Sequence, residues 1–310
     1  MLKKEIKEWL DIFNNITVPN LIANGFKPNA INAREGLANI TKSLISDIPV
    51  VAQIQDDIIE TFSYNVPVRI YNPNPNKKLP VIVYLHGGGH MAGSVTVYDP
   101  ICRKLANITE HIVVSVEYRL SPENPYPLGI IDCYNAIKNV WNVLNSRSMN
   151  YLKELSIVGD SGGGAIATTV AMKAQFDDNI NIKRQVLIYP SVDYTMSFPS
   201  IEINGTGYLL AKSKISWYFD NYFQKGEDRK NASPLFGEFT SKLPKTLIFT
   251  AEYCPLRDEG FEYAKRLKDI DIYVEHYNLE NMIHTFMNME DLCKDECNFV
   301  YNKIKNFLKE

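Results

Sequence analysis

The amino-acid sequence predicts an α/β domain with a mostly parallel central sheet flanked by helices. Strand-like runs alternate with segments whose apolar residues recur every three or four positions, and this alternation is typical of βαβ units. The strand-like runs are VPVRIY, LPVIVYLHG, HIVVSVEYRL, LKELSIVGD, RQVLIYP, KTLIFTAEY and DIYVEHY. The helical runs between them are YDPICRKLANIT, LGIIDCYNAIKNVWNVL, GAIATTVAMKAQF and DEGFEYAKRLKDI. With 310 residues, 45% of them hydrophobic, the chain is long enough to bury one large core.

Two stretches interrupt this alternation. Residues 1–50 look helical and contain no strand, and residues 195–235 contain the aromatic-rich run SKISWYFDNYF. We expect both to form parts of a helical cap over an α/β core made of residues 51–194 and 236–310. The Pro- and Asn-rich run NPNPNKK is predicted to be a surface hairpin that joins the strand VPVRIY to the strand LPVIVYLHG.

Composition and charge exclude several classes of protein. The formal net charge of −3 gives no basic surplus, so we expect no nucleic-acid partner. The N-terminus MLKKEIKEWLDIF lacks the apolar run of a signal peptide, and no later run is long enough to span a membrane. The odd, scattered set of cysteines predicts a cytoplasmic protein with free thiols and no metal site. These cysteines are Cys102, Cys133, Cys254, Cys293 and Cys297.

The candidate nucleophile is Ser161. It lies in Gly159-Asp160-Ser161-Gly162-Gly163, after the strand LSIVG and before the helix AIATTVAMKA. A Gly-x-Ser-x-Gly motif at a strand-to-helix turn holds the serine in a strained conformation with its hydroxyl above the sheet. A tight connection or a phosphate cradle is the plainer alternative for such a turn. The same letters occur in trypsin-like proteases, but those enzymes are all-β, and here a long helix follows the serine.

A glycine loop offers hydrogen-bond donors for an oxyanion. His86-Gly87-Gly88-Gly89 follows directly after the strand VIVYL. A tetrahedral acyl-transfer intermediate needs two or three N–H donors aimed at its oxyanion. We expect Gly88 and Gly89 to donate from this loop and Gly162 from the residue after the nucleophile. No Gly-Lys-Ser/Thr follows, so the loop does not match a P-loop, and we expect no metal at His86 and His90.

The candidate general base is His284. Among the five histidines, His86 and His90 lie in the glycine loop, His111 precedes a strand and His276 lies within one. His284 falls in a loop after the last strand, and the order serine, acid, histidine is that of the α/β-hydrolase fold.

These segments together resemble the hormone-sensitive-lipase-like family of carboxylesterases. The resemblance spans about residues 65–290 and rests on four segments: HGGG at 86–89, EYRLSPE at 117–123, GDSGG at 159–163 and PLRDE at 255–259. It implies an α/β-hydrolase core under a mostly helical cap, hydrolysis of small-molecule esters with short or medium acyl chains, and no cofactor. It also leaves a homodimer open, through the last strand edge or its neighbouring helices.

The acid of the triad departs from the family pattern. Relatives resembling this chain have an aspartate directly before Pro-Leu-x-Asp-Glu, where this chain has Cys254. A thiol with an ordinary pKa of about 8.5 replaces a carboxylate poorly. If a helix begins at Pro255, Asp258 lies one turn further on and is our candidate for the catalytic acid. Glu252 is the other carboxylate within reach, and loss of the acid is the third alternative.

We therefore expect a serine carboxylic ester hydrolase that acts through an acyl-enzyme. Acetylated amines or sugars would use the same chemistry with a different leaving group. The alternative is a catalytically weakened ligand-binding homologue, since the plant gibberellin receptor resembles the family and lacks a working triad. The aromatic side chains of the inserted segment either wall an acyl pocket or simply pack; they are Trp217, Tyr218, Phe219, Tyr222 and Phe223.

Overall fold

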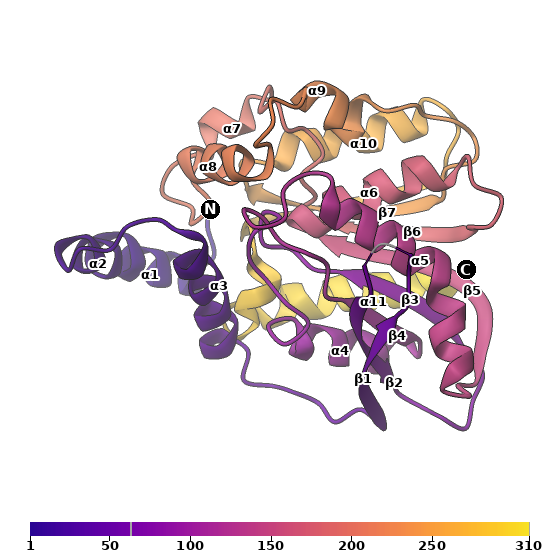
Figure 1. The fold of residues 1–310 in the computed structure, drawn as a ribbon. Helices are drawn as coiled ribbons and strands as arrows, with labels where there is room; N and C mark the ends of the chain where they lie inside the picture. Colours follow the sequence, from indigo (N-terminus) through magenta and orange to yellow (C-terminus); the bar gives the residue numbers. More distant parts are fainter. Residues whose placement is uncertain (63, 310) are drawn as a thin grey trace.

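The computed structural model describes residues 1–62 and 64–309 and contains one eight-stranded sheet (Figure 1). The strand order is β1-β2-β4-β3-β5-β6-β7-β8. β1 pairs with β2, and β2 with β4, in antiparallel fashion, whereas all other neighbours are parallel. The strands are β1 (Gln53–Ile59), β2 (Val66–Asn72), β3 (Leu79–Leu85), β4 (Ile112–Val116), β5 (Tyr151–Asp160), β6 (Ile182–Ile188), β7 (Lys245–Tyr253) and β8 (Val274–Ile283). The predicted mostly parallel α/β sheet is confirmed.

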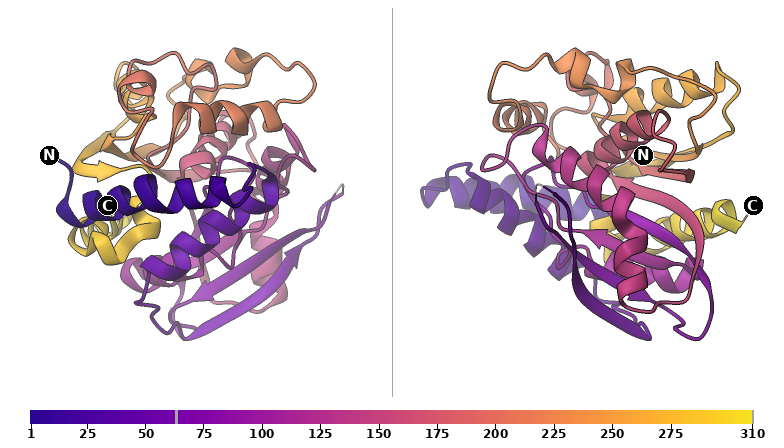
Figure 2. Two further views of the ribbon diagram at one scale, coloured as in Figure 1. Left: turned by 90° about the vertical axis from the view of Figure 1, so that its left-hand side faces the viewer. Right: turned by 45° about the vertical axis from the view of Figure 1, so that its right-hand side comes forward.

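Helices cover both faces of this sheet. The crossover helices are α4 (Asp99–Thr109), α5 (Leu128–Ser146), α6 (Ser161–Ala174) and α10 (Arg257–Lys268), and α11 (Lys294–Lys309) follows the last strand. α4 and α11 pack against each other on one face, and α5 packs against α6 on the other (Figures 1 and 2). Alternate residues of a strand belong to two hydrophobic cores on opposite faces of the sheet. Ile82 and Tyr84 of β3 lie in the core on the α4 side, whereas Val81 and Val83 lie in the core on the α5 side.

Two helical segments lie outside this layered core. The N-terminal segment contains α1 (Lys4–Ile12), a π-helical turn (Phe13–Thr17), α2 (Val18–Ala23) and α3 (Ala30–Leu44). In Figure 1, α1 and α2 extend to the left of the sheet. The inserted segment between β6 and β7 contains α7 (Ser200–Ile203), α8 (Lys212–Tyr222), α9 (Arg229–Ala232) and a short 3-10 turn (Pro234–Phe236). Both segments are helical, as their sequences predict.

Two details of the sheet differ from expectation. β1 was not predicted, because QIQDDII carries polar residues on a half-exposed edge strand and lacks a long apolar run. The hairpin prediction at NPNPNKK is wrong: β2 and β3 are joined by this segment, but β4 lies between them in the sheet.

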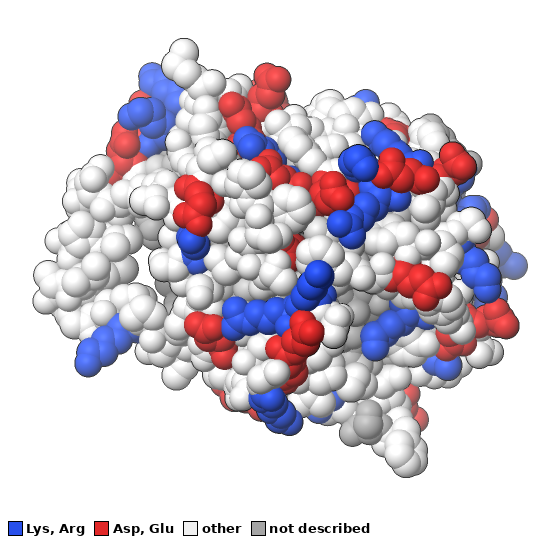
Figure 3. Space-filling view, turned by 90° about the horizontal axis from the view of Figure 1, so that it is seen from above, with Lys and Arg blue, Asp and Glu red and all other residues white. Residues whose placement is uncertain are grey.

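Charges on one face of the molecule are mixed. In the view of Figure 3, basic and acidic side chains are interspersed, and neither sign forms a continuous area. Within residues 1–62 and 64–309, no helix has both the length and the apolar content needed to cross a bilayer.

Candidate active site

Ser161 lies at the junction of β5 and α6. Its φ of 52° places the backbone in the left-handed region, as expected for a strained strand-to-helix turn. Close backbone approach explains the glycine two positions later: a Cβ at Gly163 would lie 2.0 Å from the carbonyl oxygen of Leu85. The local sequence therefore fixes the turn that exposes the serine hydroxyl.

His284 follows directly after β8 and contacts this serine. The Ser161 Oγ lies 2.8 Å from His284 Nε2, although 123 residues separate them in the chain. His284 is 3% exposed, and its ring packs against Tyr189 with the ring centroids 4.7 Å apart. Burial lowers the pKa of His284 to about 3, with a smaller contribution from the charge of Lys214. The imidazole is therefore neutral near pH 7, the form that can accept the serine proton.

Cys254 occupies the other side of the imidazole. Its Sγ lies 3.1 Å from His284 Nδ1, and the backbone N–H of Leu256 donates to the same sulfur at 3.3 Å. The residue is fully buried at the end of β7, and burial raises the pKa of its thiol. The three side chains Ser161, His284 and Cys254 thus form a continuous hydrogen-bonded chain in which the third group is uncharged.

The structure does not bring the other two candidate acids to the imidazole. The Asp258 carboxylate accepts from Arg257 Nε at 2.8 Å and from the Ser200 N–H at 2.9 Å. Glu252 accepts from the N–H of Asn281 at 2.8 Å. Asp258 is in the first turn of α10, as expected, but its carboxylate is held by Arg257 and Ser200 rather than by His284. The expectation that Asp258 is the catalytic acid is therefore wrong in this structure, because Cys254 occupies the position beside His284 Nδ1.

Of the three predicted oxyanion donors, Gly162 directly follows the serine and Gly89 lies against Gly162. Gly162 is the second residue of α6, where the N–H has no acceptor within the helix. A Cβ at Gly162 would lie 3.2 Å from the Gly89 nitrogen, so the two backbones nearly touch. Gly88 and Gly89 have φ values of 124° and 62°, which L side chains rarely adopt. The ring of Tyr218, on α8, lies directly over Gly89 and borders the site.

A buried carboxylate that sequence reasoning did not single out supports the glycine loop. Asp160 accepts from the Gly87 N–H at 2.7 Å and from the hydroxyls of Tyr84 and Tyr98, each at 2.9 Å. It is 2% exposed, and burial raises its pKa to about 6 against the opposing effect of these hydrogen bonds. Asp160, the residue before the nucleophile, is thus hydrogen-bonded to Gly87 at the start of the oxyanion loop. Only the adjacency of β3 and β5 brings these groups together, so spacing along the chain gave no signal.

The loop histidines and most inserted aromatic rings pack in the interior. His86 stacks on Tyr118 with ring centroids 4.4 Å apart, and His90 stacks on Tyr222 at 4.0 Å. Phe219, Tyr222 and Phe223 belong to the buried core. Among the described residues, no group of three potential metal ligands comes together.

A serine hydroxyl bonded to a histidine above the carboxyl ends of a mostly parallel sheet defines a hydrolase of the α/β class. Comparison with known proteins supports the same class of protein. A family model described as alpha/beta hydrolase fold matches residues 82–288, and the chain belongs to this family. The resemblance to hormone-sensitive-lipase-like carboxylesterases is confirmed, and the relatives of this chain include esterases and carboxylesterases.

Individual relatives cover most of the chain. An arylesterase of Saccharolobus solfataricus is 30% identical over 290 residues, 92% of each protein. The carboxylesterase NlhH of Mycobacterium tuberculosis is 35% identical over 231 residues, 72% of each. A solved esterase structure from Pyrobaculum calidifontis superposes with a TM-score of 0.88 at 30% identity, covering 99% of this chain and 97% of that one.

Proposed function

We propose that the protein is a serine carboxylic ester hydrolase that acts on small esters with short or medium acyl chains through an acyl-enzyme. Ser161 is the nucleophile, His284 the general base, and the N–H groups of Gly88, Gly89 and Gly162 bind the oxyanion. The 2.8 Å contact between Ser161 Oγ and His284 Nε2 carries this proposal. The helical segments at residues 1–50 and 195–235 form the cap over the site.

In the first half-reaction, Ser161 Oγ attacks the ester carbonyl carbon while its proton passes to His284 Nε2. The carbonyl oxygen becomes an oxyanion held by the glycine amides. The intermediate collapses, the bond to the alcohol oxygen breaks, and His284 protonates the departing alcohol. Water then attacks the acyl group on Ser161, gives its proton to His284, and the carboxylic acid leaves as Ser161 regains its proton.

Cys254 limits this cycle in two ways. Its buried thiol is neutral, so no negative charge faces the imidazolium that forms in each transition state. A thiol can also donate to Nδ1, which favours the tautomer with a proton on Nε2, and that tautomer cannot accept from Ser161. An aspartate accepts only and enforces the productive tautomer. We therefore expect slow turnover compared with an enzyme that carries a complete triad.

The test is hydrolysis of p-nitrophenyl acetate, butyrate, octanoate and palmitate by the wild type and by Ser161→Ala. We expect saturable wild-type turnover that falls with the longest acyl chain and disappears in the variant. Equal rates for both proteins would overturn the serine mechanism, and a preference for palmitate would overturn the acyl-length proposal.

A second candidate function is favoured by one observation, the neutral thiol in the position of the acid. A homologue that binds an ester-like ligand without turnover would keep the Ser161 and His284 geometry and tolerate Cys254. Saturable binding of butyrate esters, observed by isothermal calorimetry with no acid released, would decide for this alternative.

A further inference from the structure

Arg34, on α3 of the N-terminal segment, holds the back of the glycine loop. Its Nε donates to the carbonyl oxygen of Met91 at 2.9 Å, and its Nη2 donates to the carbonyl oxygen of Ser121 at 3.1 Å. The same guanidinium forms a two-pronged ion pair with Glu123, at 3.0 Å and 2.5 Å. One side chain therefore joins α3 to two segments that are far apart in the sequence, the glycine loop at Met91 and the segment that contains Ser121 and Glu123.

The loop that Arg34 contacts is the one that presents the oxyanion donors. The N–H groups of Met91 and Ala92 donate back to the Gly88 carbonyl, at 3.2 Å and 2.9 Å, and close the loop into a tight turn. On its outer side, the His90 carbonyl accepts from both the N–H and the hydroxyl of Ser121, at 2.8 Å and 3.0 Å. Arg34 thus contacts the loop directly at Met91. It also contacts the loop indirectly, because it binds Ser121 and Ser121 donates to the His90 carbonyl.

The loop has a conformation that needs such support. Gly88, Gly89 and His90 all have positive φ values, of 124°, 62° and 61°. Glycine adopts such values without strain, whereas at His90 this conformation is costly and persists only where surrounding contacts fix it. The direction of the Gly88 and Gly89 N–H groups depends on the same peptide planes, and misplacing an oxyanion donor has a large effect on the transition state.

We infer that Arg34 is a positioning residue for the oxyanion hole, through which the N-terminal helical segment controls the catalytic step. This inference rests on the proposed function. Arg34 contacts the loop at Met91, two residues beyond Gly89, and is assigned no contact with substrate. Its effect is expected on the transition state rather than on binding of the ester.

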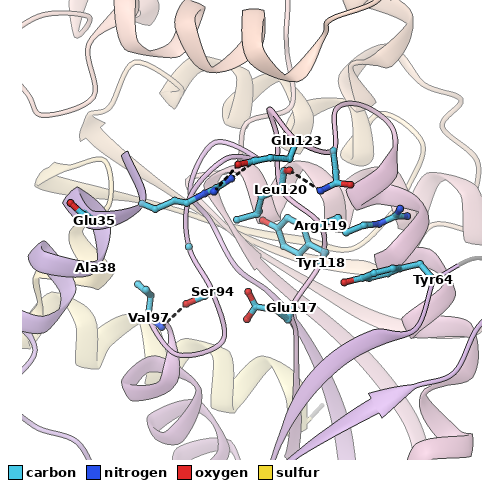
Figure 4. A pocket seen from close by; sticks show the side chains of 13 residues that line it. Glu35, Ala38, Tyr64, Ser94, Val97, Glu117, Tyr118, Arg119, Leu120 and Glu123 are labelled. Atoms are coloured by element: carbon cyan, nitrogen blue, oxygen red, sulfur yellow. Dashed lines mark hydrogen bonds and ion pairs between the residues drawn. The ribbon is translucent and has the colours of Figure 1, made fainter. Parts of the chain in front are cut away.

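A cavity behind the loop makes the inference testable by chemical rescue. It has a volume of about 620 Å³ and is lined by Arg34, Gly93, Ser94, Glu117 and Glu123, among others. Figure 4 shows Ser94 and Glu117 on its lower side and Glu123 at its upper edge. The Arg34 side chain is 33% exposed, so a small cation from solvent can reach the place of the guanidinium in a truncated variant.

The experiment compares the wild type with Arg34→Ala, Arg34→Lys and the control Glu123→Gln on p-nitrophenyl butyrate. Arg34→Ala is expected to lower kcat about 10- to 100-fold with KM nearly unchanged, below the loss of about 10²–10³ for a deleted donor. An alkylboronic acid, which mimics the tetrahedral intermediate on serine, should bind more weakly by the same factor. Millimolar guanidinium chloride, against sodium chloride at the same ionic strength, should restore part of kcat in Arg34→Ala only.

Glu123→Gln keeps the bonds of Arg34 to Met91 and Ser121 and should change kcat less than threefold. Arg34→Lys, with one compact cation, should lie between the wild type and Arg34→Ala. Unchanged kcat in a folded Arg34→Ala, an effect on KM alone, or absence of guanidinium rescue would overturn the inference. Ser161→Ala run in the same assay separates the two proposals: wild-type turnover equal to that of Ser161→Ala means that the serine mechanism itself has failed.

Discussion

Cys254 contacts His284 Nδ1 at 3.1 Å, on the opposite side of the imidazole from Ser161. The geometry of a catalytic triad is therefore present, while its negative charge is missing. The predicted consequences concern the catalytic rate, its pH dependence and the stability of the protein.

Cys254→Asp is predicted to raise kcat. A carboxylate at this position would accept from Nδ1 only and would stabilise the imidazolium, and the corresponding loss in a serine protease lowers kcat by about 10⁴-fold. We expect a gain of at least about 10-fold on p-nitrophenyl butyrate. Cys254→Ser, which remains neutral and can still donate, is the matched control and should leave kcat near the wild-type value. A lower rate in Cys254→Asp, in a folded protein, would contradict the prediction.

The pH dependence should change with the same substitution. In the wild type, burial lowers the pKa of His284 to about 3, so the base is already deprotonated at mildly acidic pH. The value of kcat/KM should then be flat from about pH 8 down to about pH 5, since it reports the free enzyme. In Cys254→Asp the carboxylate raises the pKa of His284, so kcat/KM should fall with acidification within this range. An acid limb near pH 6.5 in the wild type, with circular dichroism unchanged, would contradict this.

Asp258→Asn is predicted to leave catalysis nearly intact. The Asp258 carboxylate binds Arg257 and the Ser200 N–H, and the amide oxygen of an asparagine can retain one of these contacts. We expect kcat within about threefold of the wild type and a loss of about 1 kcal/mol in the free energy of unfolding, the usual size of a charge-assisted contact at a partly exposed site. Urea denaturation and p-nitrophenyl butyrate kinetics measure the two quantities. Loss of nearly all activity would show that Asp258 supports His284 after all.

Asp160 should make the stability of the protein depend on pH. Its pKa is raised to about 6 in the folded state by burial, compared with about 3.9 in an unfolded chain. The native state therefore favours the protonated form, and this contribution to stability is complete below about pH 4 and is lost as the pH rises through about 6. At 1.36 kcal/mol per pKa unit the change is at most about 3 kcal/mol.

The measurement is urea denaturation at several pH values for the wild type and Asp160→Asn. The variant cannot ionise and should show a smaller decrease in the free energy of unfolding between about pH 4 and about pH 6. Identical pH dependence in the two proteins would exclude Asp160 as its source.

The sequence predicts the sheet and the reacting pair because both depend on local patterns. Apolar runs identify β2 to β8, and the strand-to-helix motif identifies Ser161 without any knowledge of distant contacts. His284 could be found by elimination among five histidines. The role of Cys254 against that of Asp258 could not be decided from spacing, since both lie between the end of β7 and the first turn of α10 and only four positions separate them.

Other parts of the site depend on contacts between distant segments. Asp160 reaches Gly87 because β3 and β5 are neighbours in the sheet, and Arg34 reaches Met91 because α3 packs against the loop. For neither Asp160 nor Arg34 does the surrounding sequence pattern identify the residue that it contacts. β1 escaped detection because the strand is polar and lies at the sheet edge, where packing imposes no apolar pattern.

The role of Ser161 as the nucleophile is tested most directly by intact-protein mass spectrometry. The wild type and Ser161→Ala are each mixed with p-nitrophenyl butyrate and quenched rapidly with acid. We expect the wild type to gain the mass of one butyryl group, which peptide mapping places on Ser161, and the variant to gain none. A butyryl group found on Cys254 or another residue, or turnover retained by Ser161→Ala, would contradict Ser161 as the nucleophile.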